Sequence, residues 1–410
     1  MGAANPLNFM TCYACRDVGP HGTLSTSLGG EFKEHWGQAS LNCILSIDAT
    51  VPLNGNASLK VARTGSGDVT YDTVQEPGKG IGEHQASVGF AVYIPSGHEP
   101  ADLDPTYPWV TLFGFETAGY VALGEDMKLR IVDASGVDKK TTITVLSPDT
   151  LYWVALKINQ RDPGAAGTDF WLRVYNAAGT LLEEISCIGA AALYTDLQVF
   201  MGVRTLVASA SSFTYHLGGG YSVIGDFWPP VLPTFVDGKV PTGLGTYNNW
   251  TSSVPGNKWL DVDDVPDNAD TDYNYRTVTA AKQTFSHAAS GIPVGSNVLA
   301  VGVRTMTRKY AGVIVYGYGM MRLGGTDLVG DTYSANAATY SGQGRVLTTK
   351  TPAGADWTIA NVDAVEIGMD CYFLIGAPNI RCSSVVLFAA YGDEEAPPPP
   401  SGRLSKVMIL

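Results

Sequence analysis

The sequence predicts an all-β protein of two tandem antiparallel β-sandwiches of the jelly-roll type, joined by a proline-rich linker and followed by a tail. Short segments in which apolar and polar residues alternate with period two recur along the chain, as in half-buried strands. Turn-forming residues separate these segments, with 47 Gly and 23 Pro in 410 residues. No long segment has the apolar period of an amphipathic helix, and 356–365 is the best short helix candidate.

The clearest strand pair lies in residues 151–175. Tyr152 and the apolar residues at every second position after it share one face, while Trp153 and Lys157 lie on the other. Residues 170–175 repeat this alternation. The residues between the two segments are rich in Gly, Pro, Asp and Ala, which predicts a long hairpin loop.

The first module is expected to span 9–227, after a loose arm of residues 1–8. Its strands are predicted at 9–11, 40–45, 57–62, 86–94, 109–115, 119–123, 128–133, 141–146, 152–158, 170–175, 180–187, 198–205 and 213–226. About ten to thirteen short strands in one module are typical of a two-sheet sandwich or jelly roll.

A composition shift marks the boundary between the modules. Proline has no amide hydrogen for a sheet ladder, so a semi-rigid linker is expected over 228–243. The prolines in it are Pro229, Pro230, Pro233 and Pro241. The second module follows over 244–392, and its clearest strands are predicted at 284–287, 298–309, 311–323 and 385–391.

The segment 393–410 combines a proline run with an apolar tag. Four consecutive prolines form a stiff extended spacer. The tag consists of Lys406, Val407, Met408, Ile409 and Leu410. We expect it to dock on the edge of a neighbouring sheet during assembly, and the alternative is a frayed tail.

Charge and hydropathy exclude several classes of function. The net charge is −13 and the pI is about 4.8, and no basic face is visible, so nucleic-acid binding is not expected. No apolar run reaches the length of a membrane helix, which predicts no membrane insertion. The N-terminus lacks a basic region followed by an apolar run, so no signal peptide is expected and synthesis is placed in a cytoplasm.

Three tryptophans are candidates for carbohydrate binding, because an exposed indole ring can stack on a sugar. They are Trp153, Trp171 and Trp250. The alternative for the first two is packing against a second layer of the fold.

An acidic run in the second module is a candidate calcium site, since calcium prefers several carboxylate oxygens from one loop. Its members are Asp261, Asp263, Asp264, Asp267, Asp270 and Asp272. Their spacing does not match an EF-hand loop, and the alternative is an acidic solvated loop. No other cofactor is expected.

The six cysteines are predicted to be mostly reduced, buried thiols. Cys12 and Cys15 have the spacing of half a zinc site, but no second Cys or His pair follows at a suitable distance. No nucleophile elbow, Walker loop or H-E-x-x-H motif is present. On these grounds we expect that the protein is not an enzyme.

The first module resembles the concanavalin/laminin-G-like jelly rolls. The residues that carry this resemblance are 151–156, 170–175 and the turn at 176–179. Glycoside hydrolases of that fold carry Glu-x-Asp-x-x-Glu on one strand, and this pattern is absent here. The lectin members' calcium and sugar loops are not recognisable either, so the resemblance implies the fold alone.

The second module resembles a β-sandwich domain found in bacteriophage virion proteins. The segments that carry this resemblance are 245–247, 250–251, 262–266, 270–273 and 355–368. In that family the domain often follows a laminin-G-like module, as it does here. The resemblance implies a component of a phage particle.

The leading hypothesis is therefore a structural virion protein of the tail, the tail fibre or a capsid decoration. Such a protein would contact other virion proteins and assemble as a homo-oligomer. The alternative is a lectin-like adhesin of the particle that binds a host surface glycan.

Overall fold

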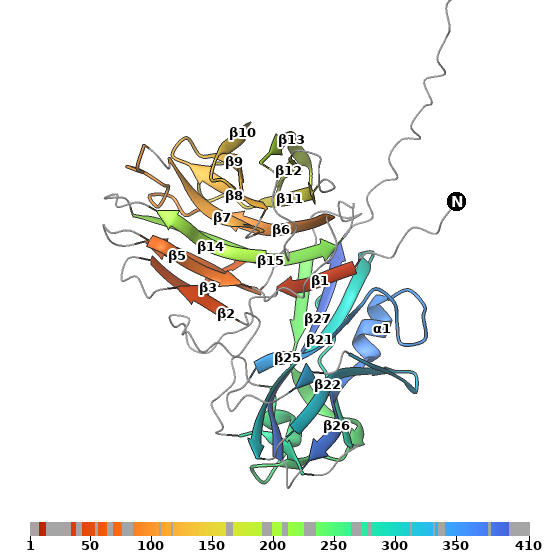
Figure 1. Ribbon diagram of the computed structural model, residues 1–410. Helices are drawn as coiled ribbons and strands as arrows, with labels where there is room; N and C mark the ends of the chain where they lie inside the picture. The colour runs from red at the N-terminus through yellow and green to blue at the C-terminus, as the bar shows by residue number, and fades with distance from the viewer. Residues whose placement is uncertain are drawn as a thin grey trace, which may run out of the picture.

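The structure is a computed structural model, and it describes 18 segments of the chain. They are residues 8–13, 34–37, 43–53, 56–63, 69–75, 85–105, 108–115, 118–160, 167–190, 199–206, 212–224, 235–263, 272–277, 281–311, 314–330, 333–334, 341–375 and 379–392. The fold is all-β, as predicted. Its described strands form four antiparallel sheets, which we name A to D (Figure 1).

Sheets A and B form the first sandwich. Sheet A contains, in spatial order, β13 (Leu181–Gly189), β12 (Thr168–Asn176), β11 (Tyr152–Gln160), β6 (Gln85–Tyr93), β15 (Phe213–Ile224), β4 (Asn56–Arg63) and β3 (Cys43–Leu53), with β1 (Asn8–Tyr13) on β15. Sheet B contains β10 (Asp138–Val145), β9 (Lys128–Asp133), β8 (Gly119–Gly124), β7 (Trp109–Phe115), β14 (Val199–Leu206), β5 (Val69–Gln75) and β2 (Glu34–Gly37).

The predicted hairpin is confirmed. Strands β11 and β12 pair in register along their whole length, from Tyr152 opposite Asn176 to Gln160 opposite Thr168. The apolar face, which includes Leu156 and Leu172, is buried against sheet B. Period-two alternation predicted this pair correctly because one face of the sheet is buried, and a buried face requires an apolar residue at every second position.

The core of the first sandwich joins sheets A and B through aromatic side chains. The rings of Phe90 on β6 and Phe113 on β7 lie 5.0 Å apart between centroids. The Tyr215 hydroxyl on β15 donates to the Thr111 carbonyl on β7 at 2.7 Å, which satisfies a buried polar group at the interface of the sheets.

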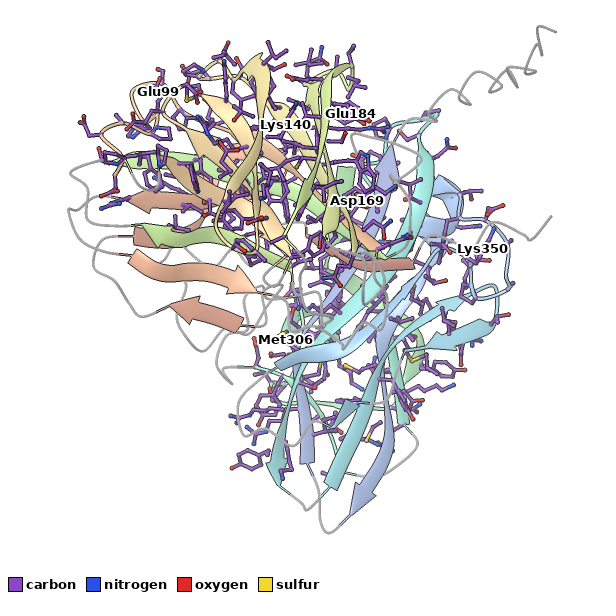
Figure 2. The ribbon with its side chains drawn as sticks, turned by 45° about the horizontal axis from the view of Figure 1, so that its top comes forward. Glu99, Lys140, Asp169, Glu184, Met306 and Lys350 are labelled. Atoms are coloured by element: carbon purple, nitrogen blue, oxygen red, sulfur yellow. The ribbon has the colours of Figure 1, made fainter. Side chains whose placement is uncertain are left out.

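Glu183 links sheet A to sheet B at one edge of this sandwich. Its carboxylate, on the edge strand β13 of sheet A, accepts the backbone N–H of Thr144 at 2.7 Å and of Ile143 at 2.9 and 3.0 Å, both on the edge strand β10 of sheet B. Figure 2 labels Lys140 of β10 and Glu184 of β13 at this same edge. Two edge amides of β10 are thus occupied by a side chain.

Sheets C and D form the second sandwich. Sheet C contains β18 (Thr251–Ser252), β19 (Asn274–Arg276), β27 (Asn379–Gly392), β21 (Asn297–Ala311) and β25 (Ser341–Thr348), with β16 (Phe235–Lys239) on β27. Sheet D contains β17 (Pro241–Asn248), β20 (Ala281–His287), β26 (Glu366–Ile375), β22 (Ile314–Leu323) and β23 (Thr326–Val329), with β24 (Tyr333–Ser334) on β22.

The linker predicted over 228–243 is too long. Strand β16 pairs with β27 from Phe235 to Lys239, and β17 begins at Pro241, so both belong to the second sandwich. Pro241 is the first residue of an edge strand, a position where a missing N–H leaves no ladder bond unmade. Proline content alone therefore does not separate a linker from an edge strand.

Two short helical segments occur among the described residues. The helix expected within 356–365 is α1 (Ile359–Ala364), and the Thr358 side chain caps it by accepting the Asn361 N–H at 3.1 Å. A 3-10 turn, η1 (Lys258–Asp261), precedes the strand β19 in the second sandwich. Neither segment has the length and apolar character of a bilayer-spanning helix.

Candidate functional site

Two of the three tryptophans predicted to bind sugar are buried. Trp153 is 2% exposed and packs with Leu53, Ala91 and Tyr175 on the outer side of sheet A. Trp250 is 1% exposed, and its Nε1–H donates to the Ala281 carbonyl at 2.8 Å. Neither ring offers a free face to a ligand, so the burial of both argues against the predicted role and fits the packing alternative for Trp153.

Trp171 keeps part of its ring at the surface. It lies on β12 opposite Lys157 of β11, whose Nζ is 5.0 Å from the ring centroid. The next outward residue on β12 is Arg173, which forms an ion pair with Glu184 at 2.5 Å. A half-buried indole beside polar and charged groups is compatible with sugar stacking.

A second aromatic surface, which the sequence reasoning missed, lies on the outer face of sheet C. The Arg381 guanidinium is 3.3 Å from the ring centroid of Tyr310 and 4.2 Å from that of Tyr273. Tyr310 is 59% exposed, whereas Arg381 is only 8% exposed. We call Tyr273, Tyr310 and Arg381 the tyrosine–arginine stack. Its members come from three distant segments, and the only sequence signal was the high tyrosine content of this module.

Tyr247 is the centre of a charged network on the outer face of sheet D. Its hydroxyl donates to Asp327 Oδ2 at 3.0 Å and accepts from Arg322 at 3.0 Å. Asp327 also forms ion pairs with Lys282 at 2.6 Å and Arg322 at 2.5 Å. We call these four residues the Tyr247 network. Burial tends to raise the pKa of the Asp327 carboxyl, but its three hydrogen bonds outweigh this and lower the pKa.

Glu366 holds the neighbouring part of this face. Its carboxylate accepts the Thr246 N–H at 2.8 Å, the Thr246 hydroxyl at 2.7 Å and the Thr284 hydroxyl at 2.6 Å. These bonds fix the bulged part of β17, which carries Tyr247 across the sheet. The carboxylates of Asp327 and Glu366 on this face are therefore both engaged in hydrogen bonds.

Only half of the predicted calcium ligands lie within the described residues. They are Asp261, Asp263 and Asp272, while Asp264, Asp267 and Asp270 lie outside. In the part of the chain that the structure describes, no group of three or more His, Cys, Asp or Glu side chains is placed to hold a metal ion. Burial raises the pKa of the Asp261 carboxyl, and the negative charge of Asp272 adds to this effect against hydrogen bonds from Ser252 and Ser253.

Burial shifts the pKa of three titratable side chains of the two sandwiches, those of His216, Cys187 and Cys371. His216 Nδ1 is 2.9 Å from the Ser58 hydroxyl oxygen, and both residues are at most 1% exposed. Burial lowers the pKa of His216 to about 4. Burial also raises the pKa of Cys187 to about 11 and of Cys371 to about 12, so both thiols stay protonated at neutral pH.

Cys371 and Cys382 are buried, as predicted for most of the cysteines, and Cys187 is partly buried. The candidate half zinc site at Cys12 and Cys15 is not described at the level of side chains, nor is Cys43. The apolar tag 406–410 lies outside the described residues, and its docking stays a prediction.

Comparison with known proteins gives no family for this chain. No protein-family model matches the chain, and no curated protein matches it. Among solved structures, the chain is similar to the marine PL-14 alginate lyase from Aplysia kurodai, with 8% identity and a TM-score of 0.39 over 53% of this chain and 100% of that one. It is also similar to the N-terminal CBM22-1–CBM22-2 tandem domain of Paenibacillus barcinonensis Xyn10C, with 8% identity and a TM-score of 0.24 over 95% of this chain and 100% of that one.

The prediction that the protein is not an enzyme is wrong. Similar solved structures include alginate lyase Aly36B, with 10% identity and a TM-score of 0.33 over 49% of this chain and 96% of that one. They also include a Trypanosoma rangeli sialidase, with 14% identity and a TM-score of 0.28 over 52% of this chain and 34% of that one. The all-β architecture is shared with enzymes, so missing sequence motifs do not exclude catalysis. TM-scores of this size assign no reaction to the chain.

Proposed function

We propose that this protein is a structural component of a bacteriophage particle, in the tail, the tail fibre or a capsid decoration. The proposal rests on the segments in which the second module resembles phage virion proteins. Trp250 and Trp357 of these segments are buried in the core, and Thr246 is bound to Glu366. These residues stabilise the second sandwich, so the segments that carry the resemblance belong to the framework of the module, which supports the proposal.

Assembly into a particle requires surfaces that contact neighbouring subunits. Exposed aliphatic side chains gather on the edge strands β10 and β13 of the first sandwich. Ile143 is 84% exposed, Ile188 is 55% exposed and Val145 is 53% exposed. We assign this edge to contacts with another virion subunit, since apolar side chains gathered at one edge favour association.

Immunogold electron microscopy of purified particles from the source tests the proposal. Label on the tail, the fibres or the head is the expected result, and its position distinguishes tail from decoration. Purified particles without label, and without peptides of this protein in mass spectrometry, would contradict the proposal.

Aspartate substitution of the exposed edge tests the assembly surface. Ile143→Asp combined with Ile188→Asp should reduce incorporation into particles about tenfold or more, because it places charge in an apolar contact. The control is Val294→Asp, at a fully exposed valine on the second sandwich. Equal incorporation of both variants would argue against this surface.

Glycan binding is the second candidate function, and the tyrosine–arginine stack favours it. Tyr310 offers an exposed ring whose other side is held by Arg381, a rigid arrangement that suits sugar stacking. On a glycan array, Tyr310→Ala should abolish binding if this surface is used, whereas Trp171→Ala should abolish it if sheet A is used. No binding by the unmodified protein would remove this candidate.

A further inference from the structure

Two buried side-chain oxygens without a hydrogen-bond partner lie near η1 in the second sandwich. Asp261, the last residue of η1, is 4% exposed, and its Oδ2 has no partner. Asn274, the first residue of β19, is 0% exposed, and its Oδ1 has none. Leaving such an atom unpaired in the interior costs roughly 1–3 kcal/mol, so each of these oxygens is a candidate ligand atom.

The hydrogen bonds around η1 bring these two residues together. Asn274 Nδ2 donates to the carbonyl of Lys258, the first residue of η1, at 2.7 Å. This bond fixes the orientation of the amide, because only the nitrogen can donate, and Oδ1 is the atom left free. Ser252 is the register partner of Asn274 in the pairing of β18 with β19, and its hydroxyl also lies beside the Asp261 carboxylate.

The charges at this place favour a cation. Asp272 lies close enough for its charge to oppose ionisation of Asp261. The positive charge of Lys258 favours ionisation of Asp261, but its ammonium donates its hydrogen bonds to Asn248 Oδ1 at 2.6 Å and to the Trp250 carbonyl. A buried carboxylate with a second carboxylate as neighbour is stabilised most by a bound positive ion.

We propose that Asp261, Asp272 and Asn274 bind one Ca²⁺ ion beside η1, with the Ser252 hydroxyl oxygen and water as further ligands. All of these donors are oxygens, the ligands that calcium takes in flexible geometry and in numbers of six to eight. Two of these residues, Asp261 and Asp272, belong to the acidic run, whereas Ser252 lies in β18 and Asn274 in β19. The ion would tie η1 to β19, and its binding is independent of the phage assignment.

Thermal unfolding and calorimetric titration of the full-length protein, first treated with EGTA, test this site. Adding CaCl2 to a hundredfold excess over its Kd should raise the Tm of the second sandwich by roughly 5 °C or more, and MgCl2 should raise it less. Absence of both a Tm shift and a binding heat with CaCl2 would overturn the proposal and indicate that buried water satisfies the two oxygens.

Three variants locate the ion. Asp261→Asn should abolish the calcium response and, in EGTA, should leave the Tm equal or higher, because it removes a buried charge without a counter-ion. Asp272→Asn, at a half-buried position that tolerates change, should weaken calcium binding about tenfold. Asp102→Asn is the control, an exposed residue with φ of 54° that asparagine adopts readily. Wild-type calcium binding by both Asp261→Asn and Asp272→Asn would place the ion elsewhere and overturn the assignment.

Discussion

At the scale of single residues, Tyr247 shows how a surface network can be structural. Lys282 lies 5.2 Å and Arg322 4.8 Å from its ring centroid, and both cations also bind Asp327. Each charge in this network therefore has an opposite charge as a neighbour. Such a set of paired charges stabilises the outer face of sheet D.

Removing one hydroxyl should measure the strength of this network. Tyr247→Phe loses the bonds to Asp327 and Arg322, and we expect the free energy of unfolding to fall by about 1–2 kcal/mol in urea titration. The exposed Tyr310→Phe is the control and should change it by less than about 0.5 kcal/mol. A similar loss in both variants would contradict a special role for Tyr247.

The buried His216 predicts a pH dependence of stability. Its pKa is lowered from 6.5 to about 4 by burial, so the folded protein resists protonation that the unfolded chain accepts. Its contribution is complete above about pH 6.5 and is lost as the pH falls towards 4, by up to about 3 kcal/mol. Urea unfolding at several pH values should show this slope, and His216→Gln should remove it.

The control for that measurement is His98→Gln, because His98 is exposed. It should keep the slope of the unmodified protein between pH 6.5 and 4. If His216→Gln also keeps that slope, another group is responsible for it.

Side-chain roles were harder to predict than side-chain directions. Alternation placed Trp153 and Trp171 on the face opposite the core correctly. It did not reveal that Leu53, from the end of β3, packs near Trp153 while Trp171 stays at the surface. What covers an outer face depends on segments distant in sequence, and periodicity contains no information about them.

At the scale of elements, the edge strands of the first sandwich depend on Glu183. Its carboxylate bonds two amides of the opposite sheet and so replaces a strand neighbour. Glu183→Gln should lower the free energy of unfolding by about 1–2 kcal/mol, because charge-assisted bonds to both N–H groups are lost.

Hydrogen exchange at the amides of Ile143 and Thr144 provides the local measurement. Both should exchange faster in Glu183→Gln. The neighbouring Glu184→Gln loses only a surface ion pair with Arg173 and should leave these amides unchanged. Unchanged exchange in Glu183→Gln would contradict its role at the edge.

Strands with apolar alternation could be predicted from the sequence. Strands whose conformation depends on pairing with a neighbouring strand could not. The hairpin of β11 and β12 lies close to its expected bounds. Strand β25, with sequence SGQGRVLT, was missed because glycine and serine have low strand propensity, and its pairing with β21 decides its conformation. Strand β16 was assigned to a linker for a similar reason.

At the scale of the whole molecule, the described strands separate into two units. Strands within 8–224 form sheets A and B, and strands within 235–392 form sheets C and D (Figure 1). Each unit has its own core, with Trp153 packed in the first unit and Trp250 in the second. This arrangement predicts two unfolding transitions with separate sensitivities.

Matched tryptophan variants should distinguish the two transitions in calorimetry. Trp250→Phe loses the bond to Ala281 and leaves a cavity, so it should destabilise the second sandwich by about 2 kcal/mol and leave the first unchanged. Trp153→Phe should do the reverse. One transition that shifts equally in both variants would show a single cooperative unit.

The two buried thiols of the second sandwich have a practical consequence. Cys371 is in β26 of sheet D and Cys382 is in β27 of sheet C, and both side chains are in the core between the sheets. An alkylating reagent reaches them only when this module opens, so their labelling rate reports the frequency of opening in the folded protein. Mass spectrometry of the alkylated protein therefore measures how often this module opens, at two residues of its core.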